Sequence, residues 1–221
     1  MMETLEICTD ASIRDFENGR QFGCSGAYCI NNREQDYLIS PDTTNNRSEM
    51  LAVYIGIKLA EKIMQYYPNK YDKIYIYSDS QFTVYGIKKW MDSWIATAGP
   101  TGTLFGTNGK PVKNQELFKA IITYCTTHNL HVNLFHQKGH VRLNSPKSLD
   151  QANKVFYTSN GFWLRPEDIY KISYYNDLID KSTRQKLYEV RESDYPKMDY
   201  SENHLTMCSY VIPLNYKQFI Q

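Results

Sequence analysis

The chain has 221 residues, 42% of them hydrophobic, so it can bury one good core with residues left for an appendage. Its formal net charge of +1 excludes binding of nucleic acid through a large overall positive charge. A nucleic acid would therefore have to be bound by local patches of positive charge. No apolar run approaches the length of a membrane span, and the five cysteines are scattered without CxxC spacing. We therefore expect a soluble, cytoplasmic protein without a disulfide framework or a zinc site.

The first part of the chain predicts three strands, a long helix and a fourth strand. Residues 5–12 alternate as in a strand, and residues 22–30 and 35–39 are two more strands joined by an Asn-Asn-Arg hairpin turn. A loop rich in capping residues precedes a helix whose apolar positions recur from Met50 to Met64. Residues 71–77 then form a strand that ends at Ser-Asp-Ser.

The next part predicts further helices and a fifth strand. A short helix follows the fourth strand and another covers residues 90–95, before a Gly- and Pro-rich loop over residues 96–112. Asn114 is expected to cap a helix, residues 131–136 to form a strand, and a last helix to begin near Ser148. This order predicts an α/β fold with a mixed five-stranded sheet and helices on both faces.

Residues 159–221 differ in composition from the residues before them and are expected to form a small C-terminal extension. The Ser-Asn-Gly sequence at residues 159–161 is a boundary signal, and the remainder is rich in tyrosine with nearly balanced charge. We predict a domain over residues 1–158 and a Tyr-rich accessory segment over residues 159–221. Residues 161–221 are expected to contact a protein or nucleic acid, and a chain ending at Ser159 is expected to fold.

Four carboxylates stand at the ends of the predicted elements. Each one alone could be a helix cap or an acid favoured by a helix dipole. As a set they offer the oxygen ligands with which two hard cations clamp the attacking and leaving oxygens of a phosphodiester. The set comprises Asp10, Glu49, Asp79 and Asp150.

Six short sequence motifs resemble type I ribonuclease H, in the same order and at similar spacings. They are Thr-Asp-Ala-Ser at 9–12, Thr-Thr-Asn-Asn-Arg-Ser-Glu at 43–49, Ser-Asp-Ser-Gln at 78–81, Gly-Ile at 86–87 followed by Trp90 and Trp94, Lys-Pro-Val-Lys-Asn at 110–114, and Lys-Gly-His at 138–140. The resemblance covers residues 5 to about 157 and implies a ribonuclease H-like fold. It also implies a metal-dependent endonuclease that cuts the RNA strand of an RNA/DNA hybrid, leaving 3′-hydroxyl and 5′-phosphate ends. Two Mg²⁺ ions, with Mn²⁺ as a substitute, would be its cofactors, and we expect a monomer.

The resemblance also implies roles for individual residues. The metal ligands would be Asp10, Glu49, Asp79 and Asp150, while His140 would assist the leaving group. Asn153, which follows an alanine as the family's acidic residue does, is the alternative to Asp150, and we favour Asp150. The substrate-binding residues would be Ser12, Thr44, Asn45, Asn46, Gln81, Trp90, Ser93 and Trp94.

The residue types agree with these roles. Side-chain amides both donate and accept hydrogen bonds, which suits minor-groove base edges and the 2′-hydroxyls that distinguish RNA from DNA. The two tryptophans would pack on DNA sugars, although their spacing of four residues suits a buried helix face equally well. Ser93 stands where the family often has an asparagine that helps Thr44 to hold a DNA phosphate.

One departure concerns residues 91–109, which form a Lys-rich substrate handle in many family members and here contain no Lys or Arg. Two other functions are compatible with the sequence: a catalytically inactive hybrid-binding module, and another two-metal nuclease of the same fold. The complete acidic set argues against the first. The amides of Asn45, Asn46 and Gln81 favour hybrid cleavage over the second.

Overall fold

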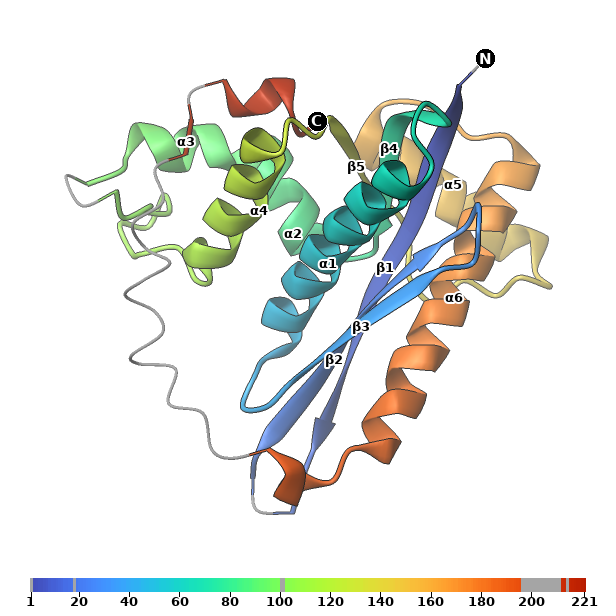
Figure 1. The fold of residues 1–221 in the computed structure, drawn as a ribbon, viewed down its shortest axis with the longest axis horizontal. Coiled ribbons are helices and arrows are strands. Elements are labelled where there is room, and N and C mark those ends of the chain that lie inside the picture. Colours follow the sequence, from blue (N-terminus) through green and yellow to red (C-terminus); the bar gives the residue numbers. More distant parts are fainter. Residues whose placement is uncertain (1, 18, 100–101, 196–211, 214) are drawn as a thin grey trace.

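The computed structural model describes residues 2–17, 19–99, 102–195, 212–213 and 215–221, and it is built around a five-stranded sheet (Figure 1). The strand order is β3-β2-β1-β4-β5; β2 is antiparallel to both of its neighbours, whereas β4 is parallel to both of its own. The predicted mixed five-stranded sheet is thus confirmed. The strands are β1 (Glu3–Asp15), β2 (Gln21–Cys29), β3 (Gln35–Ser40), β4 (Tyr71–Ser78) and β5 (Val132–His136).

Helices cover both faces of the sheet, as predicted. The first face carries α1, α4 and the short helices between β4 and α4, whose apolar side chains share one core with Leu5 and Ile7 of β1. The other face carries α5 and α6, which share a second core with Cys8 of β1 and Tyr28 of β2. The helices are α1 (Asn45–Tyr66), α2 (Gln81–Tyr85), the π-helical turn η1 (Gly86–Trp90), α3 (Met91–Ala96), α4 (Gln115–Thr127), α5 (Pro146–Asn160), α6 (Pro166–Glu189), and the 3₁₀ turns η2 (Glu192–Asp194) and η3 (Tyr216–Gln218).

The pairing of β1 with β4 ends just before two of the candidate carboxylates. The last paired residues are Thr9 and Ser78, so Asp10 and Asp79 follow where these parallel strands separate. The crevice beyond the carboxyl ends of neighbouring parallel strands is a common place for ligands to bind. Helix α1 begins near the same edge. Thr44 caps this helix by accepting a hydrogen bond from the Arg47 N–H.

Helix α6, within the expected accessory segment of residues 159–221, packs on the sheet. The expected boundary between residues 158 and 159 falls inside α5, and α6 then buries Ile172 and Ile179 in the second core. It lies against β2 at Gly26, where an added Cβ atom would stand 2.6 Å from Thr183 Cγ2 and 2.8 Å from Ile179 Cδ1. A larger residue at position 26 would therefore push α6 away from the sheet.

Residues 212–213 and 215–221 lie on the opposite side of the sheet from α6. Ile212, Tyr216 and Ile220 are buried in the first core, and Ile220 forms a parallel bridge with Val132 of β5. The Val132 and Leu134 N–H groups donate to backbone oxygens of residues 219 and 221. These residues cover the edge of β5, so the region after residue 159 contributes to both cores.

Asn114 differs locally from the prediction. It precedes α4 as expected, but its backbone is left-handed, with φ 54°, and its side chain makes no capping hydrogen bond. Its part in starting the helix is therefore conformational, since asparagine tolerates positive φ better than most residues.

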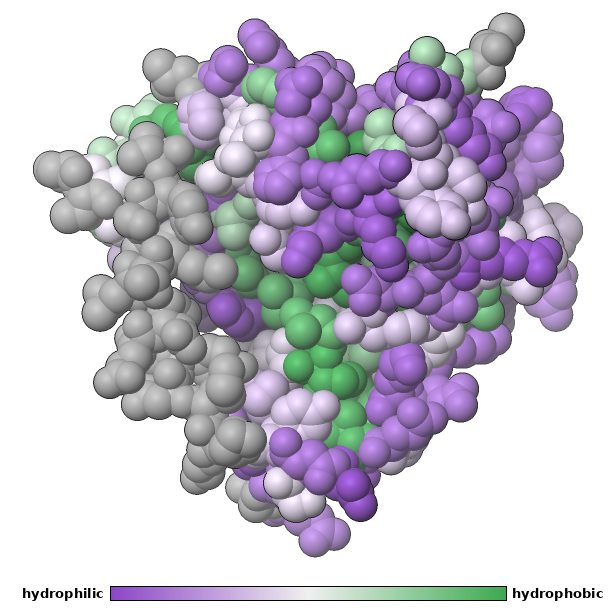
Figure 2. Space-filling model, viewed as in Figure 1, coloured by the Kyte–Doolittle hydropathy of each residue, from purple (hydrophilic) through white to green (hydrophobic). Residues whose placement is uncertain are grey.

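The face of the molecule turned to the viewer in Figure 2 is mostly hydrophilic, with hydrophobic residues in a narrow band near its centre. Within the described residues, no helix has the length and apolar content needed to cross a membrane. The cysteines at positions 8, 24, 29 and 125 are buried free thiols, while Cys208, Tyr200 and Tyr210 lie outside the described residues.

Candidate active site

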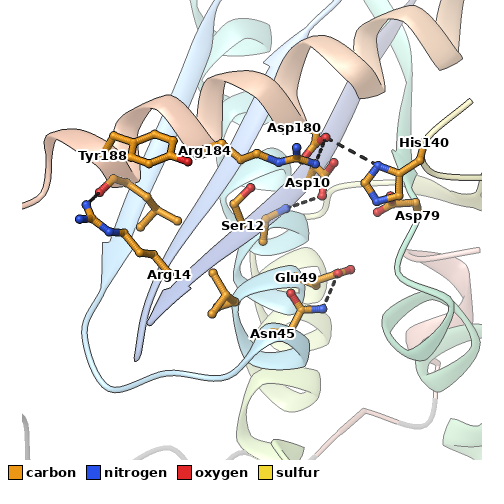
Figure 3. A pocket seen from close by; sticks show the side chains of 13 residues that line it. Asp10, Ser12, Arg14, Asn45, Glu49, Asp79, His140, Asp180, Arg184 and Tyr188 are labelled. Carbon is orange, nitrogen blue, oxygen red and sulfur yellow. Dashed lines mark hydrogen bonds and ion pairs between the residues drawn. The ribbon is translucent and has the colours of Figure 1, made fainter. Parts of the chain in front are cut away.

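A cavity of about 410 Å³ lies at the point where β1 and β4 separate (Figure 3). The side chains around it come from β1, the first turn of α1, the end of β4, the loop after β5, and α6. Its lining comprises Asp10, Ala11, Ser12, Ile13, Arg14, Asn45, Glu49, Asp79, His140, Asp180, Arg184, Leu187 and Tyr188.

The structure brings three of the four predicted carboxylates to this cavity. Asp10 is only 5% exposed, and its Oδ1 accepts a hydrogen bond of 2.7 Å from the Ala11 N–H. Glu49 lies one turn into α1 and accepts a 3.0 Å hydrogen bond from Asn45 Nδ2. Asp79 follows β4, and its Oδ2 accepts a hydrogen bond of 3.5 Å from Asn176 Nδ2 of α6.

Asp180 of α6 is the fourth carboxylate in the cavity, in place of the predicted Asp150. Asp150 is exposed on α5 and does not line the cavity. Asn153, the alternative, pairs through its side-chain amide with the backbone of Leu164. Asp180 takes this place because α5 is followed by a second helix, α6, and α6 is the helix that crosses β1 and β2 beside Asp10.

Asp180 is held from two sides. Its Oδ2 lies 2.5 Å from the Arg184 guanidinium one helical turn later and 3.7 Å from His140 Nδ1. The His140 side chain is 75% exposed and stands on a left-handed backbone with φ 51°. The neighbouring Gly139 runs so close to Asp79 that an added Cβ would lie 2.2 Å from its Oδ2, so a glycine is required there.

The carboxylates raise one another's proton affinity. Burial, followed by the charges of Asp79 and Glu49, raises the pKa of Asp10 well above its ordinary value. Burial and the charge of Asp79 raise the pKa of Glu49 to about 7, although hydrogen bonds from Ser80 and Asn45 oppose this. Burial also raises the pKa of Asp79, against the Asn176 hydrogen bond and the nearby His140.

Among the described residues, two buried carboxylate oxygens of the cavity lining have no hydrogen-bond partner. They are Asp10 Oδ2 and Asp79 Oδ1, both buried. Within the described residues, no group of three or more His, Cys, Asp or Glu side chains is already arranged as a metal site. Unpartnered carboxylate oxygens beside further carboxylates nevertheless fit a hard divalent cation, which would supply the missing positive charge.

We expect Glu49→Gln to stabilise the metal-free protein at alkaline pH. A carboxyl group whose folded pKa is about 7 binds its proton more tightly in the folded state, so stability falls as pH rises from its ordinary pKa toward that value. The free energy of unfolding of the variant should exceed that of the wild type by about 1–3 kcal/mol at pH 8, with a smaller difference at pH 5. Urea titrations in EDTA measure both values.

Saturating Mg²⁺ is the matched control for this variant. The cation binds the folded wild type and stabilises it more than it stabilises the variant. The difference in unfolding free energy between the two proteins at pH 8 should therefore change sign. A variant that is less stable than the wild type in EDTA at pH 8 would contradict the mutual repulsion.

The predicted substrate-binding residues lie in different environments. Ser12 is buried, with its Oγ 2.8 Å from Thr183 Oγ1, and Trp94 is buried against Phe118. Trp90 is 37% exposed. Exposed positions are also held by Thr44, Asn45, Asn46, Gln81 and Ser93.

Sequence reasoning missed the contribution of α6 to the site. Asp180, Arg184 and Tyr188 line the cavity, as does Arg14 at the end of β1, whose Nη1 donates to the Leu187 carbonyl. The i, i+4 spacing of Asp180 and Arg184 was a visible signal of one helix face, although it carried no information about the neighbour of that face.

Comparisons with known proteins identify the family of the chain. Residues 2–154 match the family model described as RNase H. A ribonuclease H of Hahella chejuensis is 32% identical over 120 residues, covering 54% of this chain and 72% of that protein. A ribonuclease H of Francisella philomiragia is 34% identical over 121 residues, covering 54% of this chain and 70% of that protein.

Among solved structures, the solution structure of the PFV RNase H domain is similar with a TM-score of 0.47 and 18% identity, covering 70% of this chain and 90% of that one. The family match ends at residue 154, before α6 and Asp180. Because the match spans more than half of the sequence, the chain belongs to the ribonuclease H family of nucleases that degrade RNA/DNA hybrids.

Proposed function

We propose that this chain hydrolyses the RNA strand of RNA/DNA hybrids with the help of two divalent metal ions, leaving 3′-hydroxyl and 5′-phosphate ends. The observation that carries the proposal is the convergence of Asp10, Glu49, Asp79 and Asp180 on one cavity. Four carboxylates from four separate elements form a concentration of negative charge that costs stability without cations.

Asp10, Glu49, Asp79 and Asp180 are the residues that would hold Mg²⁺, or Mn²⁺ in its place. The unpartnered oxygens Asp10 Oδ2 and Asp79 Oδ1 support this role. When bound, such ions lower the pKa of the attacking water and stabilise charge on the leaving oxygen. The Ala11 N–H and Asn45 amide orient Asp10 and Glu49 by hydrogen bonds, so the ligands are partly preorganised.

His140 is proposed to move a proton to or from the leaving group. Its ring is exposed at the cavity rim, and the Asp180 carboxylate lies near Nδ1, which leaves Nε2 available to the substrate. An imidazole ring can both donate and accept a proton, which suits this role.

Asn45, Asn46 and Gln81 are proposed to recognise the RNA strand. All three are exposed near the start of α1 or α2, and Asn45 also lines the cavity. Their amides can pair with 2′-hydroxyls and minor-groove base edges beside the cleaved bond. Thr44 and Ser93 would contact the DNA strand together with Trp90, whereas the burial of Trp94 favours a supporting role beneath them.

One assay tests the proposal against its alternatives. The full chain is incubated with RNA/DNA, RNA/RNA and DNA/DNA duplexes of the same sequence, with Mg²⁺ or with EDTA, and product ends are identified by mass spectrometry. Cleavage of RNA in the hybrid alone, only with Mg²⁺, is the expected result. Binding without cleavage would indicate an inactive hybrid-binding module, and cleavage of another duplex would indicate a different two-metal nuclease.

We expect cleavage to require several consecutive ribonucleotides. Asn45, Asn46 and Gln81 lie at the starts of two different helices, so they would contact different steps of the RNA strand. Hybrids containing one, two, four or eight ribonucleotides within a DNA strand would be compared under single-turnover conditions. Efficient cutting beside a lone ribonucleotide would contradict this expectation.

A further inference from the structure

A second, basic cavity adjoins the active site. It has a volume of about 290 Å³ and shares His140 with the carboxylate cavity. No Asp or Glu is among the residues that line it, and three of its lining side chains carry positive charge. Its lining comprises Lys138, His140, Arg142, Ser145, Lys147, Ser148 and Gln151.

The loop that carries Lys138 and Arg142 is held in place by buried anchors and leads directly into α5, which carries Lys147. Gln137 is buried and its Nε2 donates to Asn176 Oδ1 at 2.7 Å, while Val141 is buried in the second core. The Arg142 N–H donates to Ser148 Oγ at 3.0 Å, and the Ser145 hydroxyl caps α5. The loop is thus fixed at several points, and the charged side chains are presented without a large cost in loop ordering.

In the part of the chain that the structure describes, these cations stand apart from the ion pairs of the fold. Among the described residues, Lys138, Arg142 and Lys147 take part in no ion pair. The nearest acid along α5 is Asp150, which does not line the basic cavity. In a chain of net charge +1, three unpaired cations around one cavity are a local concentration of positive charge.

The cations of residues 161–221, the region expected to contact a protein or nucleic acid, differ from these three. Several of them form ion pairs within the fold, which reduces their capacity to bind phosphate, whereas Lys186 lies over the Tyr37 ring, 4.7 Å from its centroid. The pairs are Arg165 with Glu167 and Asp168, Lys171 with Glu6 and Asp168, Lys181 with Asp177, Arg184 with Asp180, and Arg191 with Asp194.

We propose that Lys138, Arg142 and Lys147, called here the basic face, bind the phosphate backbone of the strand that enters the carboxylate cavity. This inference rests on the proposed function. A strand with one phosphate at the carboxylates and passing His140 reaches the basic face next, because the two cavities meet at that residue. Lys154, exposed two turns beyond Lys147 on α5, extends the same path. The basic face replaces the Lys-rich handle that residues 91–109 lack.

The test compares two double variants with the same change of charge. Arg142→Gln/Lys147→Gln removes two charges from the basic face, and Lys58→Gln/Lys62→Gln removes two exposed charges from α1, on the opposite face of the sheet. Dissociation constants for a fluorescent RNA/DNA hybrid are measured at several salt concentrations. All proteins carry Asp10→Asn so that the hybrid is not cut.

The basic-face variant should bind about 3- to 10-fold more weakly at low salt, and its slope of log Kd against log salt should fall by about 1–2 units. The α1 control should keep the slope of the parent. In proteins with Asp10 intact, the basic-face variant should raise KM with little change in kcat. Thermal melting confirms that both variants are folded.

Equal slopes of log Kd against log salt for the two double variants would overturn the proposal. The basic face would then be assigned to binding of an acidic protein partner. This result is distinguishable from failure of the proposed function, which would appear as absence of Mg²⁺-dependent hybrid cleavage by the wild type. The binding slopes are measured without cleavage, so the two outcomes are independent.

Discussion

Asp180→Asn is expected to reduce hybrid cleavage about 10²-fold or more, whereas Asp150→Asn should leave it within about twofold of the wild type. The reason is the position of the two residues. Asp180 is 7% exposed and lines the cavity with Asp10, while Asp150 is exposed on α5 and lies outside that lining. Removing a charge that would help to hold the metal ions weakens stabilisation of the transition state.

The measurement is kcat/KM with Mg²⁺, accompanied by Mg²⁺ titration of each variant. Since Asp180→Asn also deprives Arg184 of its partner, Arg184→Gln is the matched control for loss of the ion pair alone. We expect this control to retain much more activity than Asp180→Asn. Inactive Asp150→Asn together with active Asp180→Asn would contradict the assignment and restore the sequence-based choice.

The sequence predicted the part of the site that follows directly from local elements. Asp10 and Asp79 come directly after paired residues of β1 and β4, and Glu49 sits one turn into a capped helix. Where two neighbouring parallel strands stop pairing, the residues that follow lie close together at that edge of the sheet. The strand and helix patterns alone therefore indicated three of the four carboxylates.

Asp180 could not be predicted in this way, because its place depends on how the chain returns to the sheet. A family resemblance that ends near residue 157 assigns the fourth position to the first helix after His140, which is α5. The second helix is selected instead by packing. Gly26 opposes Asp10 in the sheet and leaves room for α6 at Ile179, the neighbour of Asp180.

The two tryptophans also show that a local sequence pattern does not determine which side chains are covered by a neighbouring element. Trp90 and Trp94 are four residues apart, a spacing that suits both a buried face and a binding face. The structure separates them, because Trp94 is 7% exposed and packs on Phe118 of α4, while Trp90 remains 37% exposed. Only the position of α4 decides which ring is covered.

Ending the chain after Asn160 is expected to unfold it, contrary to the expectation that residues 1–159 fold alone. The truncation removes Ile169, Ile172, Ile179 and Leu187, each at most 3% exposed, and uncovers the face of β1 and β2 that carries Cys8 and Tyr28. Burial of one such side chain contributes about 1.5–3 kcal/mol, so the four together contribute about 6–12 kcal/mol. That is comparable to the whole stability of about 5–15 kcal/mol typical of a domain.

A chain ending at Tyr195 is the matched control, because it keeps α6 and loses residues 196–221, which include those that cover the edge of β5. It should remain folded with a lower midpoint, since Tyr216 and Ile220 are lost from the first core. Far-UV circular dichroism and thermal melting of both truncations, with the full chain as reference, measure the difference. The expected order of melting midpoints is full chain, then the chain ending at Tyr195, with no cooperative transition for the chain ending at Asn160. A cooperative transition of that shortest chain near the midpoint of the full chain would show that α6 is an appendage and would remove the structural basis for Asp180 as the fourth carboxylate.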